Sequence, residues 1–288
     1  LSHILSSLEY YYTPFPFIFV LNQPIDSLVQ KYIKEDLIFI QDISSTLPAM
    51  LFSFDNNNFL KDKENKCKCM KYNNNTGNNN NNYGNIMNNN NKKDTINITN
   101  DNDNKLPSIV DCCAAPGNKS TQLLMLYNCN LVSIEKDRLR YNTLIKFISK
   151  IKRNITKESI CNVINTLNID FFDYNTPTEY IILDPSCSGS GIHKIYIKDK
   201  ERIEKLHILQ TNILSHALSL NPKRLVYSTC SIHREENEDV IKYILENNNN
   251  YKLISVKEEL ENIIERYTHN KILLNGITEY MDRNINDN

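Results

Sequence analysis

The sequence predicts an α/β fold with a mostly parallel, doubly wound sheet that helices cover on both faces. Short, nearly continuous apolar segments alternate with longer segments of helical periodicity. Strands that are buried on both faces of a parallel sheet have this apolar character, and alternation with helices is typical of such sheets. Several apolar segments are followed at once by Asp, Cys or Gly. Because ligands bind at the carboxyl ends of parallel strands, these residues predict a functional site at one edge of the sheet.

Five apolar segments are the predicted strands, and the third is the weakest. They cover residues 108–111, 131–134, 162–164, 180–183 and 225–227. Helices are expected between them, over about 120–127, 138–152 and 203–217, where apolar residues recur at helical spacing. Residues 138–157 carry seven basic side chains and no acid, so this face is either solvated or an RNA contact.

Length and composition are typical of a globular enzyme. The chain has 288 residues, of which 40% are apolar and 23% charged, and its formal net charge is −1. That length suffices for one large domain or two small ones with a substantial core. The sequence has no run of 18 or more apolar residues, so no membrane span is expected. The eight cysteines are scattered, which indicates free thiols in a reducing compartment.

An Asn-rich stretch interrupts the pattern at residues 53–105. More than half of residues 73–104 are Asn, and so polar a segment buries too little surface to offset the entropy of ordering. We therefore expect residues 1–52 to be the N-terminal part of the catalytic domain, 53–105 a disordered insert and 106–288 the catalytic core. Cys67 and Cys69 lie within the insert and make only half of a zinc site.

The first motif follows the first predicted strand and reads DCCAAPGNK, from Asp111 to Lys119. Small residues and a Gly let the backbone approach a ligand closely, and the next helix offers free N–H groups. A single Gly fits neither a P-loop nor a G-x-G-x-x-G loop. Glu135 ends the next strand, where an acid suits the two hydroxyls of a ribose. A structural turn and a surface acid would produce the same pattern.

Two further motifs each place a thiol directly after a strand. Cys187 follows the rigid Asp184-Pro185 pair, and Cys230 follows Ser228-Thr229. A single Cys in this position is usually a small buried apolar residue. Two of them at adjacent strand ends, beside a possible ribose site, favour chemistry instead. The acidic run at 235–239 opens a helix, where the helix dipole favours acids, so it needs no function.

These motifs resemble a known family. DCCAAPGNKS, ILDPSCSGSG and LVYSTCSIHREENEDV resemble signatures of the Sun-domain RNA (cytosine-5) methyltransferases. The segment QDISS, continuing through LPAML, resembles the one that precedes the cofactor loop in that family. The similarity covers roughly residues 15–246 outside the Asn-rich stretch. PSCSGSG and LPAML most resemble the eukaryotic branch that modifies large-subunit ribosomal RNA.

The resemblance implies a Rossmann-like class I methyltransferase fold and S-adenosyl-L-methionine as methyl donor. Glu135 is implied to bind the ribose, and Asp170 to lie near the adenine, with Asp173 as a close competitor. The matching cofactor positions are Cys113, Ala114, Ala115, Pro116, Gly117, Asn118, Lys119, Glu135, Arg140, Asp170 and Asp184.

The resemblance also implies three catalytic residues. Cys230 is the expected nucleophile at cytosine C6, with a few per cent of thiolate near neutral pH, because a thiol of ordinary pKa ionises to that extent. Asp184 is expected to hydrogen-bond N3, and Cys187 to assist release. DNA cytosine methyltransferases place the nucleophile on the loop that carries Cys187 here. The nucleophile is therefore a choice between Cys187 and Cys230, and the Thr229-Cys230 pair favours Cys230. His193 and His233 flank the thiols and are expected to be ordinary surface residues.

RNA, as ribosomal RNA or a pre-ribosome, is the expected partner of a monomer without membrane contact. The resemblance implies residence in the nucleus or nucleolus, and an RNA-contacting segment upstream of Leu1 in a longer protein. The alternative is a non-catalytic ribosome-assembly factor that keeps the fold. Both thiols argue against that alternative, and against methylation of proteins or small molecules, because neither function needs a covalent base adduct.

Overall fold

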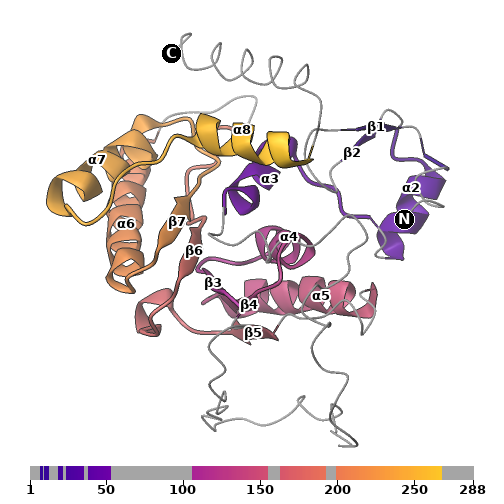
Figure 1. Ribbon diagram of the computed structural model, residues 1–288, viewed down its shortest axis with the longest axis horizontal. Helices are drawn as coiled ribbons and strands as arrows, with labels where there is room; N and C mark the ends of the chain where they lie inside the picture. The colour runs from indigo at the N-terminus through magenta and orange to yellow at the C-terminus, as the bar shows by residue number, and fades with distance from the viewer. Residues whose placement is uncertain are drawn as a thin grey trace, which may run out of the picture.

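A computed structural model describes residues 7–8, 10–12, 19–21, 24–35, 38–52, 106–154, 163–192 and 199–267 (Figure 1). The predicted Asn-rich insert, with Cys67 and Cys69, lies outside the described residues, as does His193. The predictions made for those residues therefore remain predictions.

Five parallel strands form the central sheet. They are β3 (Ser108–Asp111), β4 (Asn130–Ile134), β5 (Val163–Leu167), β6 (Tyr180–Leu183) and β7 (Arg224–Tyr227). Their order across the sheet is β5-β4-β3-β6-β7, and every neighbouring pair is parallel. The predicted α/β fold class is thus confirmed. The chain winds outward from β3 to β5 and then returns to the other side of β3, so the order reverses between β3 and β6, where such sheets bind ligands.

Helices pack on both faces because successive strand residues point to opposite sides. Ile109 and Ile182 belong to one core cluster, together with apolar residues of α3 (Ile43–Met50), α4 (Asn118–Leu126) and α5 (Arg138–Asn154). Val110, Ile181 and Leu183 belong to the second cluster, with residues of α6 (Lys200–Ser219) and α7 (Glu238–Asn247). Figure 1 shows α6 and α7 away from α4 and α5.

Three hydrogen bonds join the end of α3 to the core, although the Asn-rich stretch separates them in sequence. Gln122 donates to the Thr46 carbonyl at 2.8 Å and Tyr127 to the Met50 carbonyl at 3.1 Å. Arg224 donates to the Leu51 carbonyl at 3.2 Å. Through these bonds α3 comes to lie beside the edge of the sheet that carries the site.

The remaining described elements lie outside the five-stranded sheet. A two-stranded antiparallel sheet pairs β1 (Tyr10–Tyr12) with β2 (Phe19–Leu21). The other helices are α2 (Ser27–Lys34), α8 (Val256–Tyr267) and the short 3₁₀ helices η4 (Phe171–Asp173) and η5 (Arg234–Glu236). Among the described residues, no helix is long and apolar enough to cross a membrane.

Candidate active site

The loop between β3 and α4 owes its shape to one glycine. Gly117 has a φ of +120°, in the left-handed region that disfavours side chains. A Cβ atom at this position would lie 2.9 Å from the Cβ of Phe147 and 3.2 Å from Leu144 Cδ1. Glycine therefore allows both the turn and the close packing of the loop on α5, and α4 begins one residue later.

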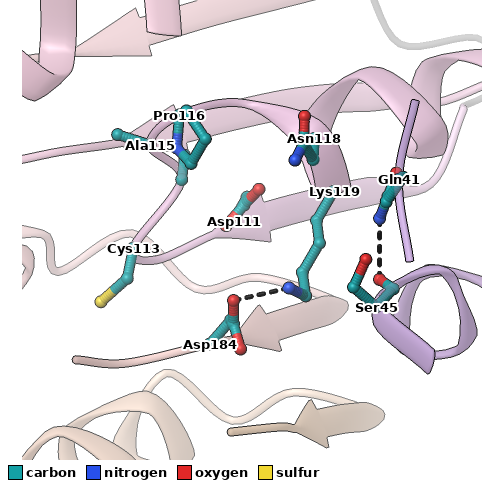
Figure 2. A pocket seen from close by; sticks show the side chains of 10 residues that line it. Gln41, Ser45, Asp111, Cys113, Ala115, Pro116, Asn118, Lys119 and Asp184 are labelled. Atoms are coloured by element: carbon teal, nitrogen blue, oxygen red, sulfur yellow. Dashed lines mark hydrogen bonds and ion pairs between the residues drawn. The ribbon is translucent and has the colours of Figure 1, made fainter. Parts of the chain in front are cut away.

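A pocket opens where this loop meets the ends of β3 and β6 (Figure 2). Most of the cofactor loop predicted from the sequence lines it, together with Asp184 across the switch in strand order. Three lining residues were not predicted as site residues: Gln41, Ser45 and Asp111. The complete lining is Gln41, Ser45, Asp111, Cys113, Ala114, Ala115, Pro116, Asn118, Lys119 and Asp184.

Asp111 is a buried acid at the end of β3, only 1% exposed. Its Oδ2 accepts a hydrogen bond from the Ser120 hydroxyl at 2.6 Å, while Oδ1 is buried without a donor in bonding geometry. Burial raises the pKa of Asp111 to about 6. The sequence feature that could have identified Asp111 as a site residue is its position at a strand end, which Asp184 and Glu135 share.

Glu135 lies at the end of β4 and is 5% exposed. Its Oε1 accepts from the Asp137 amide at 2.9 Å. Its Oε2 is buried without a hydrogen bond, and the nearest cation, Arg140, lies 3.6 Å away. Arg140 donates in turn to the Ala115 carbonyl at 2.8 Å. The structure thus brings Glu135, Arg140 and the loop together and leaves one carboxylate oxygen without a hydrogen bond, although neither residue lines the pocket itself.

Asp170 and Asp173, the two competing predictions for the adenine side, belong to the turn at η4. Asp170 caps η4 by accepting from the Phe172 amide at 3.2 Å, and it pairs with Lys136 at 2.9 Å. The hydrogen bond from Lys136 lowers the pKa of Asp170. Neither acid lines the pocket, so the assignment of either to a ligand stays a prediction.

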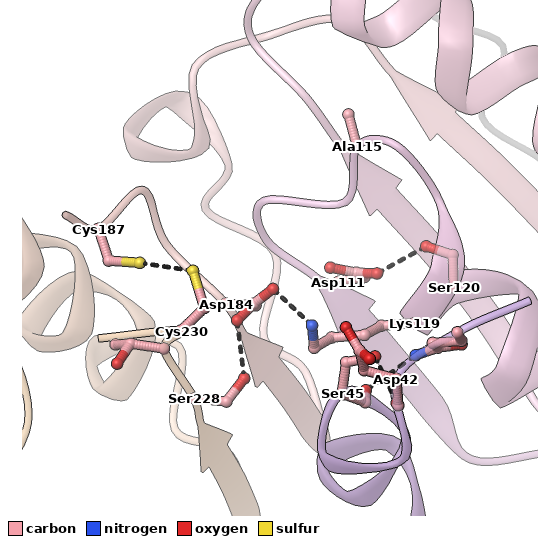
Figure 3. Close-up of polar contacts among 12 residues, drawn as sticks. Asp42, Ser45, Asp111, Ala115, Lys119, Ser120, Asp184, Cys187, Ser228 and Cys230 are labelled. Atoms are coloured by element: carbon pink, nitrogen blue, oxygen red, sulfur yellow. Dashed lines mark hydrogen bonds and ion pairs between the residues drawn. The ribbon is translucent and has the colours of Figure 1, made fainter. Parts of the chain in front are cut away.

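Asp184 connects the cofactor loop with the thiols (Figure 3). Its Oδ2 lies 2.5 Å from Lys119 Nζ, and its Oδ1 accepts from the Ser228 hydroxyl at 2.9 Å. Ser228 directly follows β7 and precedes the Thr229-Cys230 pair. Both carboxylate oxygens are therefore oriented, one from each side of the switch in strand order.

The two predicted catalytic thiols meet at the ends of β6 and β7. Cys187 Sγ lies 3.0 Å from Cys230 Sγ, and Cys230 is exposed while Cys187 is half-buried. The Gly191 amide donates to the Cys230 carbonyl at 3.0 Å, and a Cβ at Gly191 would lie 3.0 Å from that same oxygen. A glycine at 191 therefore lets the two loops approach closely enough for the thiols to touch.

The ionisation of Cys230 in the folded protein differs from that of a cysteine with an ordinary pKa. Desolvation of the sulfur, followed by the hydrogen bond between Cys230 and Cys187, raises the pKa of Cys230 to about 12. The thiol is therefore protonated near neutral pH, and its thiolate fraction is far smaller than a few per cent. Desolvation disfavours the thiolate, and the neighbouring thiol and Asp184 disfavour it further.

The acidic run at 235–239 contains a residue that the dipole interpretation missed. Glu236 is 0% exposed and lies in η5, before α7 begins. Its carboxylate accepts from Ser188, Gln210 and Ser231 rather than from the first turn of α7. Glu238 and Asp239 do stand in the first turn of α7, as the dipole interpretation expects, whereas Glu236 has contacts that only the folded chain brings together.

Known proteins share these motifs. A sequence model of the family described as 16S rRNA methyltransferase RsmB/F matches residues 95–276. The chain belongs to this family. That result confirms the predicted Sun-domain resemblance on the part of the chain that carries all three motifs.

Two curated relatives of this RsmB/F family chain are eukaryotic, as the branch prediction implies. The 28S rRNA (cytosine-C(5))-methyltransferase of Drosophila melanogaster is 38% identical over 169 residues, which are 54% of this chain and 37% of the relative. The 25S rRNA (cytosine-C(5))-methyltransferase rcm1 of Schizosaccharomyces pombe is 37% identical over 167 residues, 54% of this chain and 36% of the relative. The chain thus spans little more than a third of these relatives.

Two solved structures share the fold. A methyltransferase homolog protein from Pyrococcus horikoshii superimposes with a TM-score of 0.54 and 21% identity, over 85% of this chain and 64% of the other. NSun6 from the same organism, solved with SFG, has a TM-score of 0.50 and 20% identity, over 80% of this chain and 46% of the other. These similarities confirm the class I methyltransferase fold.

Proposed function

We propose that the protein methylates C5 of a cytosine in RNA, with S-adenosyl-L-methionine as the methyl donor. One observation carries the proposal: two thiols from neighbouring strand ends lie 3.0 Å apart, beside an acid that is bonded to the cofactor loop. C5 of cytosine is too weak a nucleophile to take a methyl group unaided. A thiol that adds to C6 removes that obstacle, and methyl transfer to nitrogen or oxygen would not need one.

Acids that line the pocket or stand at the neighbouring strand end suit S-adenosyl-L-methionine. Glu135 has a buried Oε2 without a hydrogen bond, which fits a ribose hydroxyl. Asp111 lines the pocket, and its buried Oδ1 also lacks a hydrogen bond, so it suits a cationic or hydroxyl group. The relative solved with SFG, an analogue of this cofactor, supports the assignment. When bound, the cofactor would supply an electrophilic methyl group.

Cys230 is proposed to form the covalent bond to the base. Its sulfur adds to C6 while a proton reaches N3, so that C5 carries the electron pair that accepts the methyl group. Because the pKa of Cys230 is about 12 in the free protein, its proton must leave as the base enters. The exposed position of Cys230 allows contact with a base that has left its stack.

Asp184 is proposed to face the N3 edge of the cytosine. Ser228 and Lys119 already hold both of its oxygens, so its orientation precedes substrate binding. Such a preset acid can share a proton with N3 as the adduct forms and stabilise the altered ring. The contact with Lys119 also places this chemistry next to the cofactor loop.

Cys187 is proposed to assist the last step. The proton at C5 leaves, the bond between Cys230 and C6 breaks, and the ring regains its double bond with one proton released overall. Cys187 Sγ lies 3.0 Å from the sulfur that departs, which is within reach of a proton on either thiol. The opposite assignment, with Cys187 as nucleophile, is the outcome to exclude.

The substrate is proposed to be ribosomal RNA, by analogy with the 28S and 25S rRNA enzymes among its relatives. Residence in the nucleus or nucleolus follows from the same analogy, and we expect the protein to act as a monomer. Residues 1–52 and 106–288 are proposed to form one catalytic domain, because residues of α3 share a core cluster with those of α4 and α5.

A covalent trap tests the reaction. Cys187→Ala protein is mixed with ribosomal RNA and S-adenosyl-L-methionine, and a protein–RNA complex that resists denaturation is expected on a gel. Cys187→Ala/Cys230→Ala is the matched control and should form none. If the wild-type protein labels RNA but the complex is missing, the two thiol roles are wrong. If the wild-type protein labels no RNA at all, the alternative of a non-catalytic assembly factor replaces this proposal.

A further inference from the structure

One buried carboxylate connects the two loops that carry the thiols. Glu236 Oε1 accepts a hydrogen bond from the Ser188 amide at 2.9 Å, and its Oε2 accepts from the Ser231 hydroxyl at 2.6 Å. Ser188 directly follows Cys187, and Ser231 directly follows Cys230. A single side chain thus holds the residue next to each thiol.

Gln210 extends this connection to α6. Its Nε2 donates to Glu236 Oε1 and to the Ser186 carbonyl, both at 3.0 Å, and its side chain is 0% exposed. The Cys187 loop is therefore held on both sides of the thiol, at Ser186 and at Ser188. α6 lies in the second core cluster, so the restraint is anchored in the folded core.

Three hydroxyls fill the space between the loops, and we call Ser188, Ser190 and Ser231 the hydroxyl cluster. Their oxygens lie 3.1 to 3.2 Å from one another. A hydroxyl can donate only one hydrogen, so the donation from Ser231 to Glu236 decides which way the others turn. Hydrogen bonds among hydroxyls can run either way unless a strong acceptor, here the Glu236 carboxylate, takes the hydrogen of one of them.

The carboxylate of Glu236 is charged in this position. Burial alone raises the pKa of Glu236, but hydrogen bonds from Ser188, Ser231 and Gln210 outweigh it, and the pKa lies below its ordinary value. All of its described hydrogen-bond donors are neutral groups. A buried charge held only by hydrogen bonds restrains its donors strongly, because losing any of them leaves the charge poorly solvated.

We propose that Glu236 is a positioning residue that keeps Cys187 and Cys230 within reach of one target base by fixing the two loops. It touches neither thiol in the described structure and acts through Ser188 and Ser231. The inference rests on the two-thiol reaction proposed above, but its geometric part can be measured without any catalysis.

The decisive variant is Glu236→Gln, which keeps the size of the side chain. The amide oxygen can still accept from Ser188 and Gln210, whereas the amide nitrogen that faces the Ser231 hydroxyl can donate but cannot accept, so the bond from Ser231 to a charged oxygen is lost. Ser231→Ala removes the same contact from the other loop and is the second variant. Glu238→Gln is the matched control, because Glu238 is exposed and its change removes an equal charge two residues away.

Cross-linking of the thiols gives the readout. Dibromobimane becomes fluorescent when it joins two thiols, and Cys67, Cys69 and Cys161 are changed to Ser in the 288-residue chain to reduce background. We expect Glu236→Gln and Ser231→Ala each to slow cross-linking of Cys187 to Cys230 roughly tenfold, the effect of one hydrogen bond to a charged group. The double variant should be no slower than the slower single variant, since both changes remove the hydrogen bond between Ser231 and Glu236.

Single-turnover methyl transfer should fall by a similar factor, while the Kd for S-adenosyl-L-methionine stays unchanged. Cross-linking at the wild-type rate in folded Glu236→Gln protein overturns the inference, whatever happens to thermal stability. Slower cross-linking with an unchanged single-turnover rate overturns it as well. If cross-linking slows but the wild-type protein labels no RNA, the restraint on the loops stands and the proposed function fails instead.

Discussion

The cofactor edge, at β3 and β4, differs from the thiol edge, at β6 and β7, in how its residues are held. At the cofactor edge, one glycine conformation and one arginine organise the loop, and the contact from Arg140 to Ala115 spans 25 residues. At the thiol edge, hydroxyls and a buried carboxylate organise the loops, and the contact from Ser188 to Glu236 spans 48 residues. Asp184 and Lys119 join the two edges.

This difference matches the proposed division of the site into a cofactor-binding edge and a catalytic edge. At the cofactor edge Asp111 and Glu135 each keep one buried oxygen without a hydrogen bond, whereas at the thiol edge Glu236 and the hydroxyl cluster bond to one another between the two loops. Changes at one edge should therefore leave the function of the other intact. The predictions below test that separation, starting with the largest effect.

Cys230→Ala should abolish methyl transfer, by at least roughly 10⁴-fold, because removing a covalent nucleophile has effects of this size. Binding of S-adenosyl-L-methionine should remain at the wild-type level, since Cys230 lies at the thiol edge. Labelling of RNA and calorimetry on the same preparation measure the two quantities. Turnover at the normal rate would refute the assignment of the nucleophile.

Glu135→Ala should weaken cofactor binding by about 10- to 100-fold, which corresponds to the loss of one or two hydrogen bonds to a carboxylate. Glu135→Gln should lie between this variant and the wild type. Dibromobimane cross-linking of the thiols serves as the control and should not change. An unchanged dissociation constant in calorimetry would remove Glu135 from the ribose site.

Asp111→Asn should stabilise the free protein at neutral pH. The pKa of Asp111 is raised by burial to about 6, so its charge costs stability above that pH, and stability falls as the pH rises from about 4 to 6. Removing the charge should add about 1–3 kcal/mol at pH 7, at about 1.4 kcal/mol per pKa unit, and little near pH 4. Urea unfolding at both pH values measures this, and an equal change at both would contradict it.

Cys187→Ala should make Cys230 easier to ionise. Burial contributes most to the raised pKa of Cys230 and Cys187 contributes next, so the variant should lower that pKa only part of the way from about 12. Alkylation of Cys230 by iodoacetamide at pH 9 should become several-fold faster, because the thiolate is the reacting form. Mass spectrometry of the peptide that contains residue 230 gives the rate. A pH profile identical to that of the wild type would show that the sulfurs do not interact.

The sequence predicted the parallel sheet well because buried parallel strands are continuous apolar segments. β3 and β6 begin and end where the pattern placed them, while β5 extends to Leu167 beyond the weak prediction over 162–164. Within β5, Asn165 is exposed and Thr166 is partly exposed, so polar residues dilute the apolar signal of this strand. Edge strands of this kind are recognised by pairing with a neighbour, here β4.

Within the site, the residues found from sequence are those that a local motif carries. The cofactor loop, Asp184 and both thiols stand directly after strands, so their position along the chain already places them at one edge. Gln41, Ser45 and Glu236 fall inside stretches that resemble the family, but none of them directly follows a strand. Their place at the site depends on how α3, the residues before it and η5 pack against the sheet.

The sequence by itself determined the fold class, the family and the kinds of groups at the edge of the sheet, because strand periodicity and short motifs are local properties. Only the tertiary structure decided that the sulfurs lie 3.0 Å apart, that Cys230 is protonated and that Glu236 connects the loops. Distances between residues 43 to 48 positions apart, and the burial that shifts a pKa, depend on how the whole chain packs.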